Sequence, residues 1–121
     1  MAGLTHQERM AFAETITKRM AEKYGEDLLV MGIVGSVARE ADTPYSDLDM
    51  VAVVAEGCEA KSMHLVYRNC AVSLFVMKEE PLRAILMNPC EKWEYNMGLL
   101  DSMKLLHGDP LLVKKLLGLG L

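Results

Sequence analysis

The feature that most constrains this chain is a pair of polar motifs, each attached to an apolar run. One run ends in Gly35-Ser36, and eleven residues after the serine a second run begins with Asp47-Leu48-Asp49. Side chains of an extended strand alternate between two faces, so Asp47 and Asp49 point to the same side while Leu48 points into the core. The two carboxylates can therefore share one divalent cation or hold two close ones.

The first motif supplies the other half of a phosphate and metal site. Gly35 lets the backbone come close to a bound group, and Ser36 begins a short stretch whose free N–H groups suit an anion. Either half alone is weak evidence because short polar motifs are common. Together, at this spacing and on consecutive apolar runs, they favour a site for a metal-bound phosphate.

Composition narrows the class of protein. The chain has 121 residues, enough for one domain with a core, with 51% hydrophobic and 25% charged residues, as in ordinary soluble proteins. A net charge of −4 and a pI near 5.3 give no general attraction for nucleic acid or acidic membranes. The N-terminus is polar and no apolar run is long enough to cross a membrane, so we expect a cytoplasmic protein without a membrane anchor.

The residues before the first motif predict a helix and a strand. Thr5 and Glu8 have the spacing of a capping box, and apolar residues then recur every four positions over about 6–24. Gly25 is the natural end of this helix. A nearly continuous apolar strand over 28–34 follows, which indicates cover on both faces.

The rest of the chain predicts more strands and then helices. A strand over about 47–54 is followed by a hairpin, 63–67 and 70–77, turning at Arg68-Asn69. Helices are predicted over about 79–87, 91–107 and 111–117. The expected fold is α/β of the α+β kind: a small mixed sheet with helices packed on it, in a single domain over 1–121, with a core over about 5–87 and extra C-terminal helices over about 91–118.

With these residues laid out, the chain resembles the nucleotidyltransferase superfamily that includes polymerase beta. The family pattern is Gly-Ser at the end of one strand and, about ten residues later, Asp-x-Asp on the next. The stretches 32–39 and 44–50 are similar to the N-terminal domain of kanamycin nucleotidyltransferase, and the core motif is shared with small proteins called minimal nucleotidyltransferases. The resemblance implies the nucleotidyltransferase fold.

The resemblance also implies roles for individual residues. Catalytic Asp47 and Asp49 would bind Mg²⁺, and the nucleotide would be bound by Gly35, Ser36, Arg39 and Ser46. The donor would be a nucleoside triphosphate, ATP first, and the acceptor a hydroxyl that the sequence does not identify. Two alternatives stay open: Arg39 as an exposed ion-pairing arginine, and Ser46 as a turn hydroxyl.

The sequence departs from the family in one strand. A third carboxylate is expected on the strand over 70–77, but Ser73 stands at its position, and a neutral serine is a poor Mg²⁺ ligand. The acceptor-binding domain of the kanamycin enzyme also has no counterpart in the sequence. We favour a Mg²⁺-dependent nucleotidyltransferase that borrows its acceptor site from another subunit. The alternative is a non-catalytic or degenerate nucleotide-binding or interaction module, such as the minimal-nucleotidyltransferase partner of a toxin and antitoxin pair.

Two further interpretations concern surfaces and histidines. The apolar stretch over 111–117 exceeds what a small core can cover, so it predicts a homodimer or hetero-oligomer interface. His64 lies in a predicted strand without a carboxylate or cysteine at ligand spacing, and it is interpreted as a structural histidine.

Overall fold

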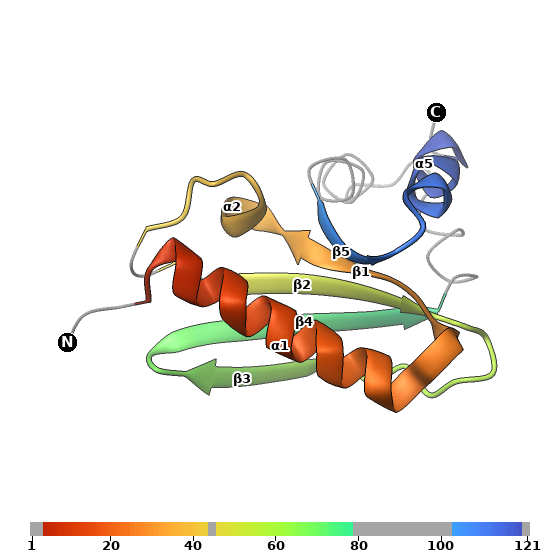
Figure 1. Cartoon of the computed structure of the whole chain (residues 1–121), viewed down its shortest axis with the longest axis horizontal. Coiled ribbons are helices and arrows are strands. Elements are labelled where there is room, and N and C mark those ends of the chain that lie inside the picture. The colour runs from red at the N-terminus through yellow and green to blue at the C-terminus, as the bar shows by residue number, and fades with distance from the viewer. Residues whose placement is uncertain (1–3, 44–45, 79–102, 120–121) are drawn as a thin grey trace, which may run out of the picture.

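The computed structural model describes residues 4–43, 46–78 and 103–119. Its elements are α1 (His6–Tyr24), the 3-10 turn η1 (Gly25–Asp27), β1 (Leu28–Val34), α2 (Gly35–Ala38), β2 (Leu48–Val54), β3 (Met63–Tyr67), β4 (Cys70–Lys78), β5 (Lys104–Gly108) and α5 (Pro110–Leu119) (Figure 1). The predicted helix over 79–87, and most of the one over 91–107, lie outside the described residues.

Five strands form one sheet in the order β3-β4-β2-β1-β5. Strands β2 and β4 run parallel, whereas the other three neighbouring pairs are antiparallel. Figure 1 shows α1 lying across one face of this sheet. The predicted α+β class, with a mixed sheet and a helix against it, is therefore confirmed.

Helix α1 begins and ends where the sequence predicts. Thr5 and Glu8 form both bonds of the capping box, and Gly25, with φ of 58°, follows the last helical residue. The buried side of the helix carries Ala13, Thr17 and Met20, which face the sheet. This packing makes the α1 side of the sheet the main hydrophobic core.

Alternation along β2 separates the core from the opposite face of the sheet. Leu48, Met50 and Ala52 are completely buried in the core beneath α1, so the residues between them point away from it. On this second face, Val53 forms a smaller apolar cluster to which residues of α5 contribute. Val53 lies near the end of β2 away from Asp49.

The hairpin of β3 and β4 turns at Arg68-Asn69, as predicted. Both turn residues have positive φ, 47° and 67°, which is the conformation that a two-residue hairpin of this twist requires. Strand β3 is an edge of the sheet and all five of its residues are exposed. Its apolar members are Met63, Leu65, Val66 and Tyr67.

The predicted helix over 91–107 is wrong at its C-terminal end. Lys104–Gly108 forms β5, which pairs antiparallel with β1 and gives that strand its second neighbour. Gly108 has φ of 104°, and a Cβ atom there would lie 2.1 Å from the Leu29 carbonyl oxygen. The strand therefore depends on a close backbone approach between distant segments, which outweighs the local helical pattern. Helix α5 then extends over the predicted region, 111–117.

Among the described residues, no helix has both the length and the apolar character that a membrane span needs.

Candidate functional site

The two predicted metal ligands lie where β2 begins. Asp47 is exposed and immediately precedes the strand, while Asp49 is half-buried within it, on the face opposite α1. Leu48 between them is completely buried, as the alternation predicts. The structure therefore places both aspartates at the start of β2, with Asp49 on the second face.

Gly35 lies directly against the Asp49 carboxylate. The antiparallel register pairs Val34 with Asp49, so the residue that follows β1 meets this side chain. Gly35 has φ of 76°, and a Cβ atom built on it would lie 3.2 Å from Oδ2 of Asp49. Glycine suits this position because it adopts the positive φ without strain and because a Cβ atom would crowd the carboxylate.

The two carboxylates interact electrostatically. Burial is the main cause that raises the pKa of Asp49, and the negative charge of Asp47 raises this pKa further. A divalent cation at this position would favour the charged form of Asp49 and so oppose the effects of burial and of the Asp47 charge. Mg²⁺ is usually held by one or two protein carboxylates, with waters and substrate phosphates completing its coordination, so this pair fits the ion.

Among the described residues, further protein ligands do not gather around this pair. Within the described ranges, the structure brings together no group of three or more His, Cys, Asp or Glu side chains that could hold a metal. A Mg²⁺ ion bound by Asp47 and Asp49 would keep coordination positions for water and for phosphate oxygens, as the ion usually does. The neutral Ser73, which is paired with Asp49, agrees with this result for the described residues.

A buried ion pair anchors the loop that leads into Asp47. Arg9 of α1 is 1% exposed and bonds to a carboxylate oxygen of Asp42 at 3.1 Å, to the Ser46 carbonyl at 3.1 Å and to the Leu4 carbonyl at 2.8 Å. His6 Nδ1 lies 2.7 Å from the other oxygen of Asp42. Sequence reasoning missed this cluster, because nothing local marks a helical arginine as buried.

The predicted nucleotide contacts have different surroundings. Ser36 is half-buried in the first turn of α2, and its carbonyl accepts a bond from the Ala41 N–H. Arg39 is exposed at the end of α2. The Ser46 hydroxyl accepts a bond from the Thr43 N–H at 2.8 Å, which closes the turn before β2. This bond favours the turn alternative for Ser46, while the role of all three in binding a nucleotide stays a prediction.

Ser73 lies beside Asp49, where the missing carboxylate was expected. The parallel register of β2 and β4 pairs these two residues, and Ser73 is in turn paired with His64 of β3. The Ser73 Oγ and the His64 Nδ1 are 3.1 Å apart. Sequence reasoning could not find this contact, because it depends on the register of strands that are distant in sequence.

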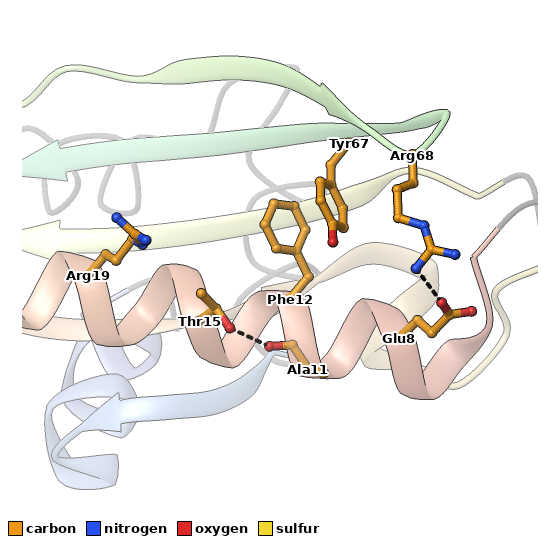
Figure 2. A pocket seen from close by; sticks show the side chains of 7 residues that line it. All are labelled: Glu8, Ala11, Phe12, Thr15, Arg19, Tyr67 and Arg68. Carbon is orange, nitrogen blue, oxygen red and sulfur yellow. Dashed lines mark hydrogen bonds and ion pairs between the residues drawn. The ribbon is translucent and has the colours of Figure 1, made fainter.

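A separate pocket of about 430 Å³ lies on the α1 side of the sheet, between α1 and the hairpin (Figure 2). Phe12 and Tyr67 stack there with ring centroids 4.1 Å apart, and Arg68 pairs with Glu8 at 2.7 Å. The remaining lining residues are Ala11, Thr15 and Arg19. None of the predicted site residues lines this pocket, so the candidate site is the carboxylate pair and not the pocket.

Comparison with solved structures identifies the fold. The chain is similar to a nucleotidyltransferase-like protein from Exiguobacterium sibiricum, with a TM-score of 0.54 and 16% identity, over 87% of this chain and 37% of that protein. The chain has the nucleotidyltransferase fold. The fold that the sequence resemblance implied is confirmed.

Sequence comparison gives a shorter but closer match. Two curated proteins described as aminoglycoside nucleotidyltransferase (4'), from Staphylococcus aureus and from a Bacillus species, are each 40% identical to the chain over 52 residues. The match covers 43% of this chain and only 21%, about a fifth, of each relative. No protein family model matches the sequence. The similarity supports membership of the nucleotidyltransferase superfamily.

Proposed function

We propose that this protein binds a Mg²⁺-nucleoside triphosphate, ATP first, and transfers its nucleoside monophosphate to an acceptor hydroxyl. The observation that carries the proposal is the carboxylate pair of Asp47 and Asp49 beside Gly35, at the start of β2. It is supported by the nucleotidyltransferase fold and by the similarity to curated nucleotidyltransferases.

Each residue of the site has a part in this reaction. Asp47 and Asp49 hold the cation, Gly35 lets phosphate oxygens approach the backbone, and Ser36 and Arg39 contact the triphosphate. Bound Mg²⁺ supplies stabilisation of the negative charge that develops on the transferred group and on the leaving pyrophosphate. The acceptor is unidentified, but the names of the curated relatives make an aminoglycoside hydroxyl the first to try.

Calorimetric titration of ATP with and without Mg²⁺ tests the proposal. Wild-type protein should bind ATP only with the metal, and the Asp47→Ala, Asp49→Ala variant should not bind it. Glu14 and Glu22 are exposed on α1, so replacing both with alanine makes the same change in net charge at a remote position and should leave binding unchanged. Equal binding by the wild type and the aspartate variant would refute the proposal.

The hairpin edge favours a second candidate function, an interaction module. Among the described strands, β3 has a neighbour on one side only, and its residue Val66 is 74% exposed. A partner of a toxin and antitoxin pair, or a second copy of this chain, could use this edge or the apolar helix α5. Light scattering of the purified protein, alone and at increasing concentration, tests self-association. A monomer at all concentrations would reject self-association. A pull-down that recovers no stable partner, together with robust transfer activity of the isolated chain, would reject the second candidate as a whole.

A further inference from the structure

A row of polar side chains crosses the second face of the sheet from the carboxylate pair to the edge. The strand registers place Asp49, Ser73 and His64 side by side on β2, β4 and β3. Because paired residues of neighbouring strands point to the same face, all three side chains share the face opposite α1. Strands are about 4.8 Å apart, so the backbones of Asp49 and His64 are separated by roughly 10 Å.

The His64 ring is held in place on both sides. Its Nδ1 lies 3.1 Å from the Ser73 Oγ, and the ring meets the ring of Phe75 edge to face at 6.0 Å between centroids. The Ser73 hydroxyl can accept a hydrogen bond from Nδ1–H, and that tautomer leaves a free lone pair on Nε2. His64 is exposed, so a ligand on the second face can reach this nitrogen.

The separation between His64 and Asp49 suits a transfer reaction. An attacking oxygen approaches phosphorus from about 3–3.5 Å, and a base must lie about 2.6–3.2 Å from the oxygen whose proton it takes. A phosphoryl group near Asp49 and a hydroxyl beside it therefore fit within the roughly 10 Å between the two backbones. Ser73 lies between them and contributes only a short side chain to this space.

We propose that His64 accepts the proton of the attacking hydroxyl, and that Ser73 positions its ring. The inference rests on the proposed function. The acceptor oxygen forms a bond to the α-phosphorus, and its proton passes to Nε2 of His64. The bond from the α-phosphorus to the bridging oxygen breaks, and pyrophosphate leaves with that electron pair. Ser73 is then a positioning residue, and its neutrality no longer counts against activity.

The test measures pyrophosphate release by the full chain with Mg²⁺-ATP, using kanamycin as the acceptor and water as the acceptor in its absence. His64→Asn keeps an amide that can bond to Ser73 but removes the proton-accepting nitrogen. We expect it to lower kcat by about 10²–10⁴-fold. Its calorimetric affinity for Mg²⁺-ATP should stay within about twofold of the wild type, because general-base catalysis acts on the transition state.

Two further variants separate catalysis from structure. Imidazole added to His64→Ala should restore part of the lost rate, which a purely structural role would not produce. His107→Gln is the control, since His107 lies on β5 at the opposite edge of the sheet and should keep wild-type kcat.

Each outcome decides the proposal. A His64→Asn variant with wild-type kcat overturns the proposal. The proposal is also overturned if His64→Asn is slow and has lost nucleotide affinity, and imidazole does not restore the rate of His64→Ala. If the wild-type protein binds Mg²⁺-ATP but releases no pyrophosphate with either kanamycin or water as the acceptor, this result contradicts a working base at His64. Absence of metal-dependent ATP binding contradicts instead the proposed function on which this inference rests.

Discussion

Removing Asp42 should destabilise the protein more than any other single change in the loop before β2. The Asp42 side chain is 3% exposed and its partner Arg9 is 1% exposed, so Asp42→Ala leaves a guanidinium buried without its counter-charge. Breaking a buried ion pair from one side costs about 3–5 kcal/mol. A domain of this size has only about 5–15 kcal/mol of stability in total.

The remaining contacts of Arg9 explain why the protein does not avoid this cost by moving the arginine to solvent. Its Nη1 keeps the Leu4 carbonyl and its Nε keeps the Ser46 carbonyl, so the side chain stays buried and cannot turn to solvent. At about 4 °C per kcal/mol, the midpoint of thermal unfolding should fall by roughly 12–20 °C. The bond from His6 to Asp42 is lost as well, which frees the start of α1 from the loop.

Urea unfolding followed by circular dichroism at pH 7 measures the effect. Glu40→Ala is the matched control, because it removes a carboxylate from an exposed position of the same loop and should change stability by at most about 0.5 kcal/mol. The double variant Arg9→Met, Asp42→Leu removes both charges and should lose less than the sum of the two single variants. A loss below about 1 kcal/mol for Asp42→Ala, or strictly additive single variants, would refute the reasoning.

The other predictions concern the carboxylate pair and the start of α1. Because burial and then the charge of Asp47 raise the pKa of Asp49, the folded state holds this proton more tightly, and metal-free stability falls as the pH rises through the raised pKa. Asp49→Asn should thus raise the metal-free unfolding midpoint at pH 7 while abolishing Mg²⁺-dependent ATP binding; a lower midpoint would contradict this. Gly35→Ala should cost about 1–2 kcal/mol through its positive φ and weaken Mg²⁺-ATP binding by crowding Asp49, whereas Gly57→Ala, with open space around it, should do neither. The hydrogen bond from the Thr5 N–H is the main cause that lowers the pKa of Glu8. The stabilisation that the ionised Glu8 gives to the folded state is therefore present above the ordinary carboxyl pKa and is lost as the pH falls through the lowered pKa. Acid titrations of the Glu8→Ala variant should lack this loss of stability.

Local signals in the sequence predicted the elements that form the site. The capping box at Thr5 and the stop at Gly25 are short-range effects, and they set the bounds of α1 to the residue. The same holds for the apolar run of β1 and for the turn at Arg68-Asn69, whose backbone conformation is decided within the hairpin. The order Gly-Ser, loop, Asp-x-Asp then placed the candidate site at the start of β2.

Long-range pairing is what the sequence could not supply. Lys104–Gly108 has no strong strand pattern, and it forms β5 because the open edge of β1 is available to it. The contact between Ser73 and His64 likewise follows from the register of two strand pairs. A burial pattern cannot reveal that Arg9 lies in the core either, since its partner is 33 residues away.

The alternation along β2 also bears on how such a domain can diverge. Leu48, Met50 and Ala52 fill the core from one side of the strand, while Asp49 and its paired neighbour Ser73 lie on the second face, where the proposed site is. Replacing a residue of the second face leaves the packed volume beneath α1 unchanged. Descendants of one ancestral strand could therefore gain or lose carboxylates, or exchange one for a serine and histidine pair, while keeping the same core.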